Sequence, residues 1–255
     1  MNTLTTTSPL STYAVRLADD NVVLGQRLGE YISNAPELEE DLAIGNTALD
    51  HIGIARFLFT YAGQVEGDGR TEDDFAMFRS ERAYTNALLV EQPNTDFAHI
   101  LIRQFFFDAY QVPLWERLSS SSDAELASIA AKGLKEATYH LRRSSTWVVR
   151  LGDGTRESHL RTQAAIDGLW RFTGELCSTD EIEATLAEQG VAPRSTDMAG
   201  DWARTVDAVF EEATLTRCAD DFQTYGGRVG MHTEYLGHLL AEMQWMQRSY
   251  PGLTW

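Results

Sequence analysis

Apolar residues recur at intervals of three and four along most of the chain, which is the spacing of α-helices that bury one face. The first such segment is expected to begin after a cap at Ser11 and Thr12 and to end near residue 33. Its apolar positions are Leu17, Val22, Leu24, Leu28 and Ile32. No segment shows the alternating pattern of a run of strands, so the chain is expected to be all-α.

The same pattern predicts three more long helices. The second begins at Pro36 and continues to about residue 63, and a shorter helix is expected over residues 82–91. The third follows a cap at Asn94, Thr95 or Asp96, and Pro113 is expected to bend or restart it. The fourth lies between the turns SSSSDAEL and LGDGT. Further helices are expected over residues 158–176, 179–189, 195–217 and 231–249.

Four long helices followed by a helical extension favour a helical bundle with additional C-terminal helices. The chain shows no internal repeat and no low-complexity tract. A single domain over residues 1–255 is therefore expected, with residues 1–10 as a flexible N-terminus.

Charge and composition narrow the classes of function. A formal net charge of −17 would repel nucleic acids and anionic membranes. No stretch reaches the roughly 18 apolar residues that cross a bilayer, and the N-terminus lacks the features of a signal peptide. Cys177 and Cys218 fit no zinc or CxxC pattern and are interpreted as packing thiols. A cytoplasmic protein is expected.

Metal binding in a helical bundle depends on the spacing of acidic residues and histidines. Bundle di-iron sites place Glu and His three residues apart, on one helix face. Asp96 precedes His99 at that spacing but is the expected helix cap. The other five histidines have no acidic residue at that position. Spacings of four, Glu136/His140 and Glu234/His238, leave a mononuclear site conceivable.

A surface ion-pair cluster is the competing interpretation of the first pair, because Lys135, Arg142 and Arg143 surround Glu136. Other chemistries have less support. The chain contains no GxGxxG, P-loop or GxSxG motif.

Several blocks of sequence resemble a known family. They are NAPELEEDLAIGNTALDHIGIARFLFTYAG, ERAYTNALLVEQPNTDFAHILIRQFFFDAYQVPLWERL, KGLKEATYHLRRSSTWVVRLGDGT, LWRFTGELC and GGRVGMHTEYLGHLLAEMQWMQRSYPG. Together they resemble the C subunits of bacterial phenylacetyl-CoA ring epoxidases, over almost the whole chain from about Leu10 onward. The resemblance implies a ferritin-like bundle without catalytic iron. It also implies pairing with a homologous A subunit, which holds the di-iron centre and receives electrons from a separate flavin and iron–sulfur reductase.

The resemblance also indicates at which metal-ligand positions this chain differs from the catalytic relatives. Catalytic relatives carry Asp-Glu-x-Gly-His on the second helix, where this chain has DHIGI, so that His51 and Ile54 stand at ligand positions. Their fourth helix carries Lys-Glu-Glu-x-x-His, where this chain has Ala137 in place of a ligand and retains His140. Asn21 and Gln104 fall near the acidic positions of the first and third helices. The sequence thus predicts a degenerate site that holds no metal.

The leading hypothesis is therefore a non-catalytic, structural subunit that stabilises the di-iron A subunit in phenylacetate degradation, without a cofactor of its own. An alternative is a metal-dependent oxygenase or oxidase that acts alone through unorthodox ligands. Its ligands would be Glu136, His140, Glu234 and His238. A helical protein that has no oxygenase partner is the third hypothesis.

Overall fold

The computed structural model describes residues 8–219 and 222–253, and within these ranges it contains helices and turns but no strand. The α-helices are α1 (Pro9–Gly29), α2 (Leu38–Glu66), α3 (Glu72–Met77), α4 (Phe97–Leu118), α5 (Ala124–Gly152), α6 (Arg156–Leu169), α7 (Glu181–Glu188), α8 (Ala199–Glu212), α9 (Glu234–Met243) and α10 (Trp245–Ser249). Short 3₁₀ turns are η1 (Glu81–Ala83), η2 (Trp170–Phe172), η3 (Gly174–Cys177), η4 (Ser195–Met198) and η5 (Gly227–Val229).

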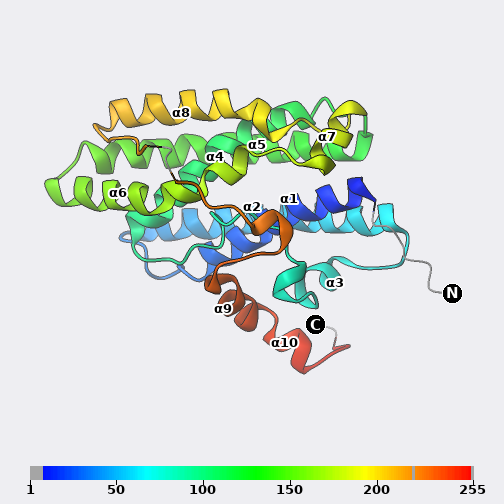
Figure 1. Ribbon diagram of the computed structural model, residues 1–255. Helices are drawn as coiled ribbons and strands as arrows, with labels where there is room; N and C mark the ends of the chain where they lie inside the picture. Colours follow the sequence, from blue (N-terminus) through cyan, green and yellow to red (C-terminus); the bar gives the residue numbers. More distant parts are fainter. Residues whose placement is uncertain (1–7, 220–221, 254–255) are drawn as a thin grey trace.

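The four long helices α1, α2, α4 and α5 form a ferritin-like bundle (Figure 1). Hydrogen bonds from Ser11 to Glu66 and between His51 and Asn21 show that α1 and α2 are antiparallel. Gly133 of α5 packs on Trp115 of α4, near the opposite end of this pair from the Phe97–Trp147 contact, so α4 and α5 are antiparallel as well. The predicted all-α, ferritin-like fold is confirmed.

A long connection of residues 67–96 joins the two pairs. Asp50 of α2 meets His140 of α5, and Phe57 meets Lys132, so these two helices also run in opposite directions. A connection of this length lets α2 and α4 run the same way, which one long crossover allows in ferritin-like bundles. The four inner faces thereby enclose one common centre.

Caps and glycines explain where the long helices begin and how closely they pack. Asp96 and Asp123 accept hydrogen bonds from the backbone N–H groups of His99 and Leu126, as N-caps do. Gly25 brings α1 to within about van der Waals distance of α2, because a Cβ there would lie 3.1 Å from the carbonyl oxygen of Ala48. The close approach brings Asn21, one turn before Gly25, within reach of α2.

The ends of several helices differ from the sequence prediction. The first helix begins at Pro9, before the expected cap, and the second begins at Leu38. Pro113 lies inside an unbroken α4. Of the flexible N-terminus expected over residues 1–10, residues 9 and 10 are helical and residues 1–7 lie outside the described ranges.

The helix expected over residues 82–91 is wrong. The segment has one 3₁₀ turn, Glu81–Ala83, and is otherwise turn and extended backbone. Its backbone N–H groups at Ala87 and Leu88 donate to the carboxylates of Asp20 and Glu175. Bonds to distant side chains thus replace those that a helix would make within itself.

Helices α6 and α8 cover α4 and α5 as a second layer, and the C-terminal helices α9 and α10 lie on the opposite side of the molecule beside α3 (Figure 1). The residues expected as one C-terminal helix, 231–249, form two, α9 and α10, which are joined at Gln244. No helix in the described part of the chain is both long and apolar enough to cross a membrane.

Buried ion pairs attach the C-terminal segment to the bundle. Arg228 donates to both carboxylate oxygens of Asp20, and His232 lies 2.8 Å from Glu91 through its Nδ1 atom. Glu175 accepts hydrogen bonds from the backbone N–H groups of Leu88 and Gly226. We call these five acidic and basic side chains, Asp20, Glu91, Glu175, Arg228 and His232, the C-terminal clasp.

Candidate functional site

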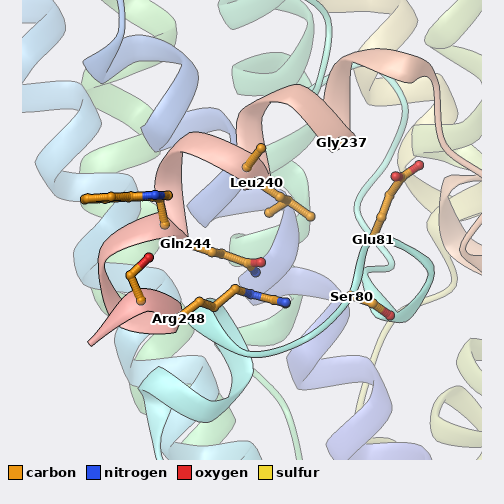
Figure 2. Close-up of a pocket in the computed structure, with 9 residues that line it drawn as sticks. Ser80, Glu81, Gly237, Leu240, Gln244 and Arg248 are labelled. Atoms are coloured by element: carbon orange, nitrogen blue, oxygen red, sulfur yellow. The ribbon is translucent and has the colours of Figure 1, made fainter. Parts of the chain in front are cut away.

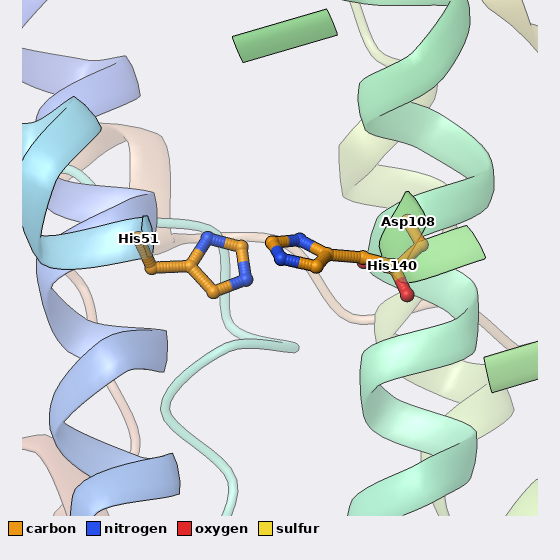
Figure 3. A group of neighbouring side chains, drawn as sticks. All are labelled: His51, Asp108 and His140. Carbon is orange, nitrogen blue, oxygen red and sulfur yellow. The ribbon is translucent and has the colours of Figure 1, made fainter. Parts of the chain in front are cut away.

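Three side chains capable of binding a metal meet at the centre of the bundle. His51 comes from α2, Asp108 from α4 and His140 from α5, and one ligand atom of each lies within 4.8 Å of the others. Figure 3 shows the two imidazoles directed toward one another from facing helices. All three residues are buried. We call His51, Asp108 and His140, together with Asn21 and Gln104, the polar centre.

Hydrogen bonds fix the state of His51. The Oδ1 atom of Asn21 lies 2.8 Å from Nδ1 of His51, so Nδ1 carries the proton and donates. The Nε2 atom then accepts from the amide of Gln104 at 3.1 Å. Burial, together with the nearby charge of His140, holds the pKa of His51 well below its ordinary value. His51 is therefore a neutral imidazole with both nitrogens occupied.

Asp108 is the one acidic side chain of the polar centre. Its two oxygens accept from the amide of Gln104 at 2.6 Å and from the hydroxyl of Ser144 at 2.8 Å. Burial raises the pKa of Asp108 to about 6, against the opposing charge of His140. The carboxyl group thus titrates much closer to neutrality than an exposed aspartate.

His140 connects the polar centre to the surface between α2 and α5. Its Nε2 atom lies 3.0 Å from Oδ2 of Asp50, whose side chain is 39% exposed. Its Nδ1 atom is buried and has no hydrogen-bond partner among the described residues, and the same is true of Oε1 of Gln104. The rings of His140 and His51 are 5.2 Å apart between centroids. One imidazole nitrogen thus has no hydrogen-bond partner inside the bundle.

Of the six ligand-equivalent positions predicted from the sequence, the four polar ones lie together in the structure. Asn21, His51, Gln104 and His140 are joined by contacts or hydrogen bonds in the polar centre. Gln111 donates to the same oxygen of Asn21 at 3.0 Å. Ile54 and Ala137 lie one turn from His51 and His140 and belong to the hydrophobic core. That these positions hold no metal stays a prediction.

One residue of the polar centre was not predicted from the sequence. Sequence reasoning treated His140 as the one retained ligand and missed Asp108, which lies across the bundle on another helix. A signal was present, because Asp108 is the one acidic residue between Phe97 and Trp115 and follows Gln104 by one helical turn.

The alternative ligand set is not assembled. Among the described residues, the one group of donors close enough for a metal contains His140 but not Glu136, Glu234 or His238. Glu234 and His238 are exposed on α9.

The donor set does not fit a pair of irons. A carboxylate-bridged di-iron site in a bundle uses about four carboxylates and two imidazoles. The polar centre offers one carboxylate, and the amides of Asn21 and Gln104 are neutral. Its two acidic oxygens and the nitrogens of His51 already have protein partners. The charge of two irons would stay largely uncompensated.

A surface hollow of about 360 Å³ lies between η1 and the α9–α10 pair (Figure 2). Two of its polar side chains make structural bonds. The Gln244 amide donates to the carbonyl oxygens of Ala76 and Arg79, and Arg248 donates to those of Met77 and Phe78. At the hollow, Gln244 and Arg248 thus join the C-terminal helices to residues 76–79.

Comparison with known proteins gives consistent matches. A family model described as phenylacetic acid catabolic protein matches residues 1–255. The chain is 48% identical over 246 residues to the C subunit of the 1,2-phenylacetyl-CoA epoxidase of Escherichia coli (strain K12). That alignment covers 96% of this chain and 99% of the relative.

Proposed function

The chain belongs to the family of phenylacetic acid catabolic proteins, and from this membership we propose that it is the non-catalytic, structural subunit of a phenylacetyl-CoA epoxidase. In this proposal it pairs in the cytoplasm with a homologous catalytic subunit that holds the di-iron centre, which a separate reductase supplies with electrons. Its own role is to stabilise and position that catalytic subunit.

The observation that carries the proposal is the Gln104 amide at the polar centre. It donates at once to His51 and to Asp108, and so it occupies the lone pairs that a metal would use. A bundle that bound two irons would need acidic groups at such positions. Here the neutral amides of Asn21 and Gln104 link His51 and Asp108 into one hydrogen-bonded network.

The identity of the relative supports a role inside an assembly. The matching Escherichia coli protein is named as a subunit of an epoxidase, and the alignment extends over nearly all of both chains. A subunit of this kind with a degenerate centre contributes through its surface. An obligate interface of this class buries about 2,000 Å² or more.

Co-expression of the catalytic subunit with and without this chain tests the proposal. We expect the catalytic subunit to be soluble, loaded with iron and active when this chain is present, and the two to elute together in size-exclusion chromatography. A catalytic subunit that is equally soluble, iron-loaded and active without this chain would refute the structural role.

A metal-dependent oxidase that acts on its own is the second candidate, and the cluster of His51, Asp108 and His140 favours it. Two imidazoles and one carboxylate are the ligand types of mononuclear iron oxygenases. Elemental analysis of the purified chain separates the candidates. About one iron or manganese per chain, lost in a His140→Ala variant, would favour the oxidase.

A further inference from the structure

The outer surface of α2 and α5 carries an apolar stripe beside a basic one. On α2, Leu42, Leu49 and Phe57 are 61%, 67% and 44% exposed. On α5, Lys132, Lys135 and Arg142 are exposed at a spacing of three and seven residues. We call these six residues the α2–α5 face. Phe57 and Lys132 join its two halves, because the ammonium lies 4.0 Å from the ring centroid.

The basic stripe is unusual for this chain. Lys132 and Lys135 are its two lysines, and residues 132–150 contain five basic side chains and one acidic one, although the formal net charge of the chain is −17. Arg143 forms an ion pair with Glu40. Within the described ranges, Lys132, Lys135 and Arg142 make no ion pair. By contrast, 11 arginines of the same ranges each form an ion pair with an acidic side chain. The charge of this stripe therefore remains free for another molecule.

The size and shape of the α2–α5 face are suited to binding another protein. Leu42 and Phe57 lie 15 residues apart on α2, which is about 22 Å at about 1.5 Å per residue. Two neighbouring helices about 10 Å apart present a strip about 20 Å wide, so the face covers roughly 450 Å². A stable interface uses about 800 Å² on each partner, and the face has the size of the centre of such an interface. Exposed leucine and aromatic side chains beside basic residues resemble an interface core with its rim.

We propose that the α2–α5 face is the surface that binds the catalytic subunit, and that this partner presents apolar side chains flanked by acidic ones. The inference rests on the proposed function. The basic and apolar halves define the complementary surface, because an acidic rim would pair with Lys132, Lys135 and Arg142 while apolar side chains cover Leu42 and Leu49.

Other occupants fit the face less well. A second copy related by a two-fold axis across the helices would bring the basic stripes of the two copies together, and an axis along the helices would place each basic stripe over the apolar stripe of the other copy. A small anion such as a coenzyme phosphate needs donors that converge. Here the two lysines and Arg142 extend along the helix, and Lys132 and Arg142 lie over the rings of Phe57 and Tyr139.

Binding of the purified catalytic subunit to two matched charge-reversal variants tests the proposal. The test variant is K132E/K135E/R142E. The control is R82E/R156E/R194E, which changes net charge equally at three exposed arginines that lie on other segments. We expect the test variant to weaken binding at least about 100-fold and the control less than about threefold, because only the former reverses contact charges. Unchanged thermal unfolding verifies that both variants are folded.

The apolar half is tested separately by Leu49→Gln, with Leu160→Gln on α6 as its control. Leu160 is 56% exposed, close to the 67% of Leu49. We expect about tenfold weaker binding for the first and no change for the second.

The outcomes distinguish this inference from the proposed function. If the unaltered chain fails to bind the catalytic subunit, the proposed function falls and this inference with it. If the unaltered chain binds and the test variants bind equally well, the surface assignment alone is refuted. A test variant that loses only self-association, or only affinity for free coenzyme A, while it still binds the catalytic subunit would also refute the assignment.

Discussion

The polar centre and the C-terminal clasp are both buried, yet they handle polar groups in opposite ways. In the clasp two acidic side chains face opposite charges, Asp20 facing Arg228 and Glu91 facing His232, and Glu175 accepts from backbone N–H groups. In the polar centre Asp108 is bonded to an amide and a hydroxyl, and His51 to two amides. The clasp holds ion pairs, and the polar centre holds groups that burial drives toward their neutral forms.

The pKa shifts follow this difference. In the clasp, burial opposes the cation at Arg228, but the charge of Asp20 outweighs burial and raises the arginine pKa. Burial also raises the pKa of Asp20 itself, against the charge of Arg228, so the contrast with the polar centre holds for the basic groups. Burial likewise opposes protonation of His232, but its hydrogen bond to Glu91 raises its pKa. In the polar centre burial dominates and the pKa of His51 falls while that of Asp108 rises. The bundle centre is thus organised to minimise charge, which is the reverse of what a binuclear metal site needs.

The largest effect is expected in the clasp. Replacing Arg228 by Met leaves Asp20 buried without its counter-charge and should lower the free energy of unfolding by about 3–5 kcal/mol. Urea denaturation measures the change, with Arg82→Met as an exposed control that should stay within about 0.5 kcal/mol. The double variant D20N/R228M should recover much of the loss. If it recovers none, the ion pair is not the cause.

A smaller effect is expected from the amide of the polar centre. Gln104→Leu keeps a side chain of similar length but removes the donor shared by His51 and Asp108. The loss of one buried donor should cost about 1–3 kcal/mol in the free energy of unfolding. Gln64→Leu, at an exposed position of α2, is the control. A cost above that of Arg228→Met would reverse the order of the two regions.

The third prediction concerns Asp108, and its effect on stability is smallest at low pH. Its pKa of about 6 lies above the ordinary value of 3.8, so the folded chain binds the proton more tightly than the unfolded chain. Its contribution to stability therefore declines as pH rises from about 4 to about 6. Asp108→Asn should remove this decline and gain up to about 3 kcal/mol relative to the unaltered chain at pH 7.

Unfolding curves at several pH values measure this difference. The gain of Asp108→Asn should be near zero at pH 4, grow up to about pH 6 and stay constant above it. His51, whose pKa is lowered, acts in the other direction, because its contribution is lost as pH falls below its ordinary pKa. A gain that does not depend on pH would show that Asp108 is not the titrating group.

The spacing of apolar residues and the helix caps predicted most of the fold. Asp96 and Asp123 cap their helices as such residues do, whereas Pro113 lies inside an unbroken α4 whose residues on either side of it belong to the core. Residues 82–91 could not be predicted, since Asp20 and Glu175, which are remote in sequence, determine their conformation. Local propensity contains no information about such bonds.

The candidate site shows the same limit. Family motifs located Asn21, His51, Gln104 and His140, all of which the fold brings together. A search for acidic residues along one helix could not find Asp108, because its distance from His140 depends on how α4 packs against α5. The network through Gln104 follows from that packing as well. Spacing within a helix thus predicts which residues share a face, and the packing of helices decides which of them meet.

The most direct test of the central claim is the iron content and turnover of the reconstituted complex in which this chain carries His140→Gln. The substitution removes the one imidazole nitrogen of the polar centre that has no hydrogen-bond partner. We predict that iron per complex and the epoxidation rate stay within about twofold of the unaltered complex, since the iron is held by the partner. A loss of iron together with activity would place a working metal in this chain and contradict the account.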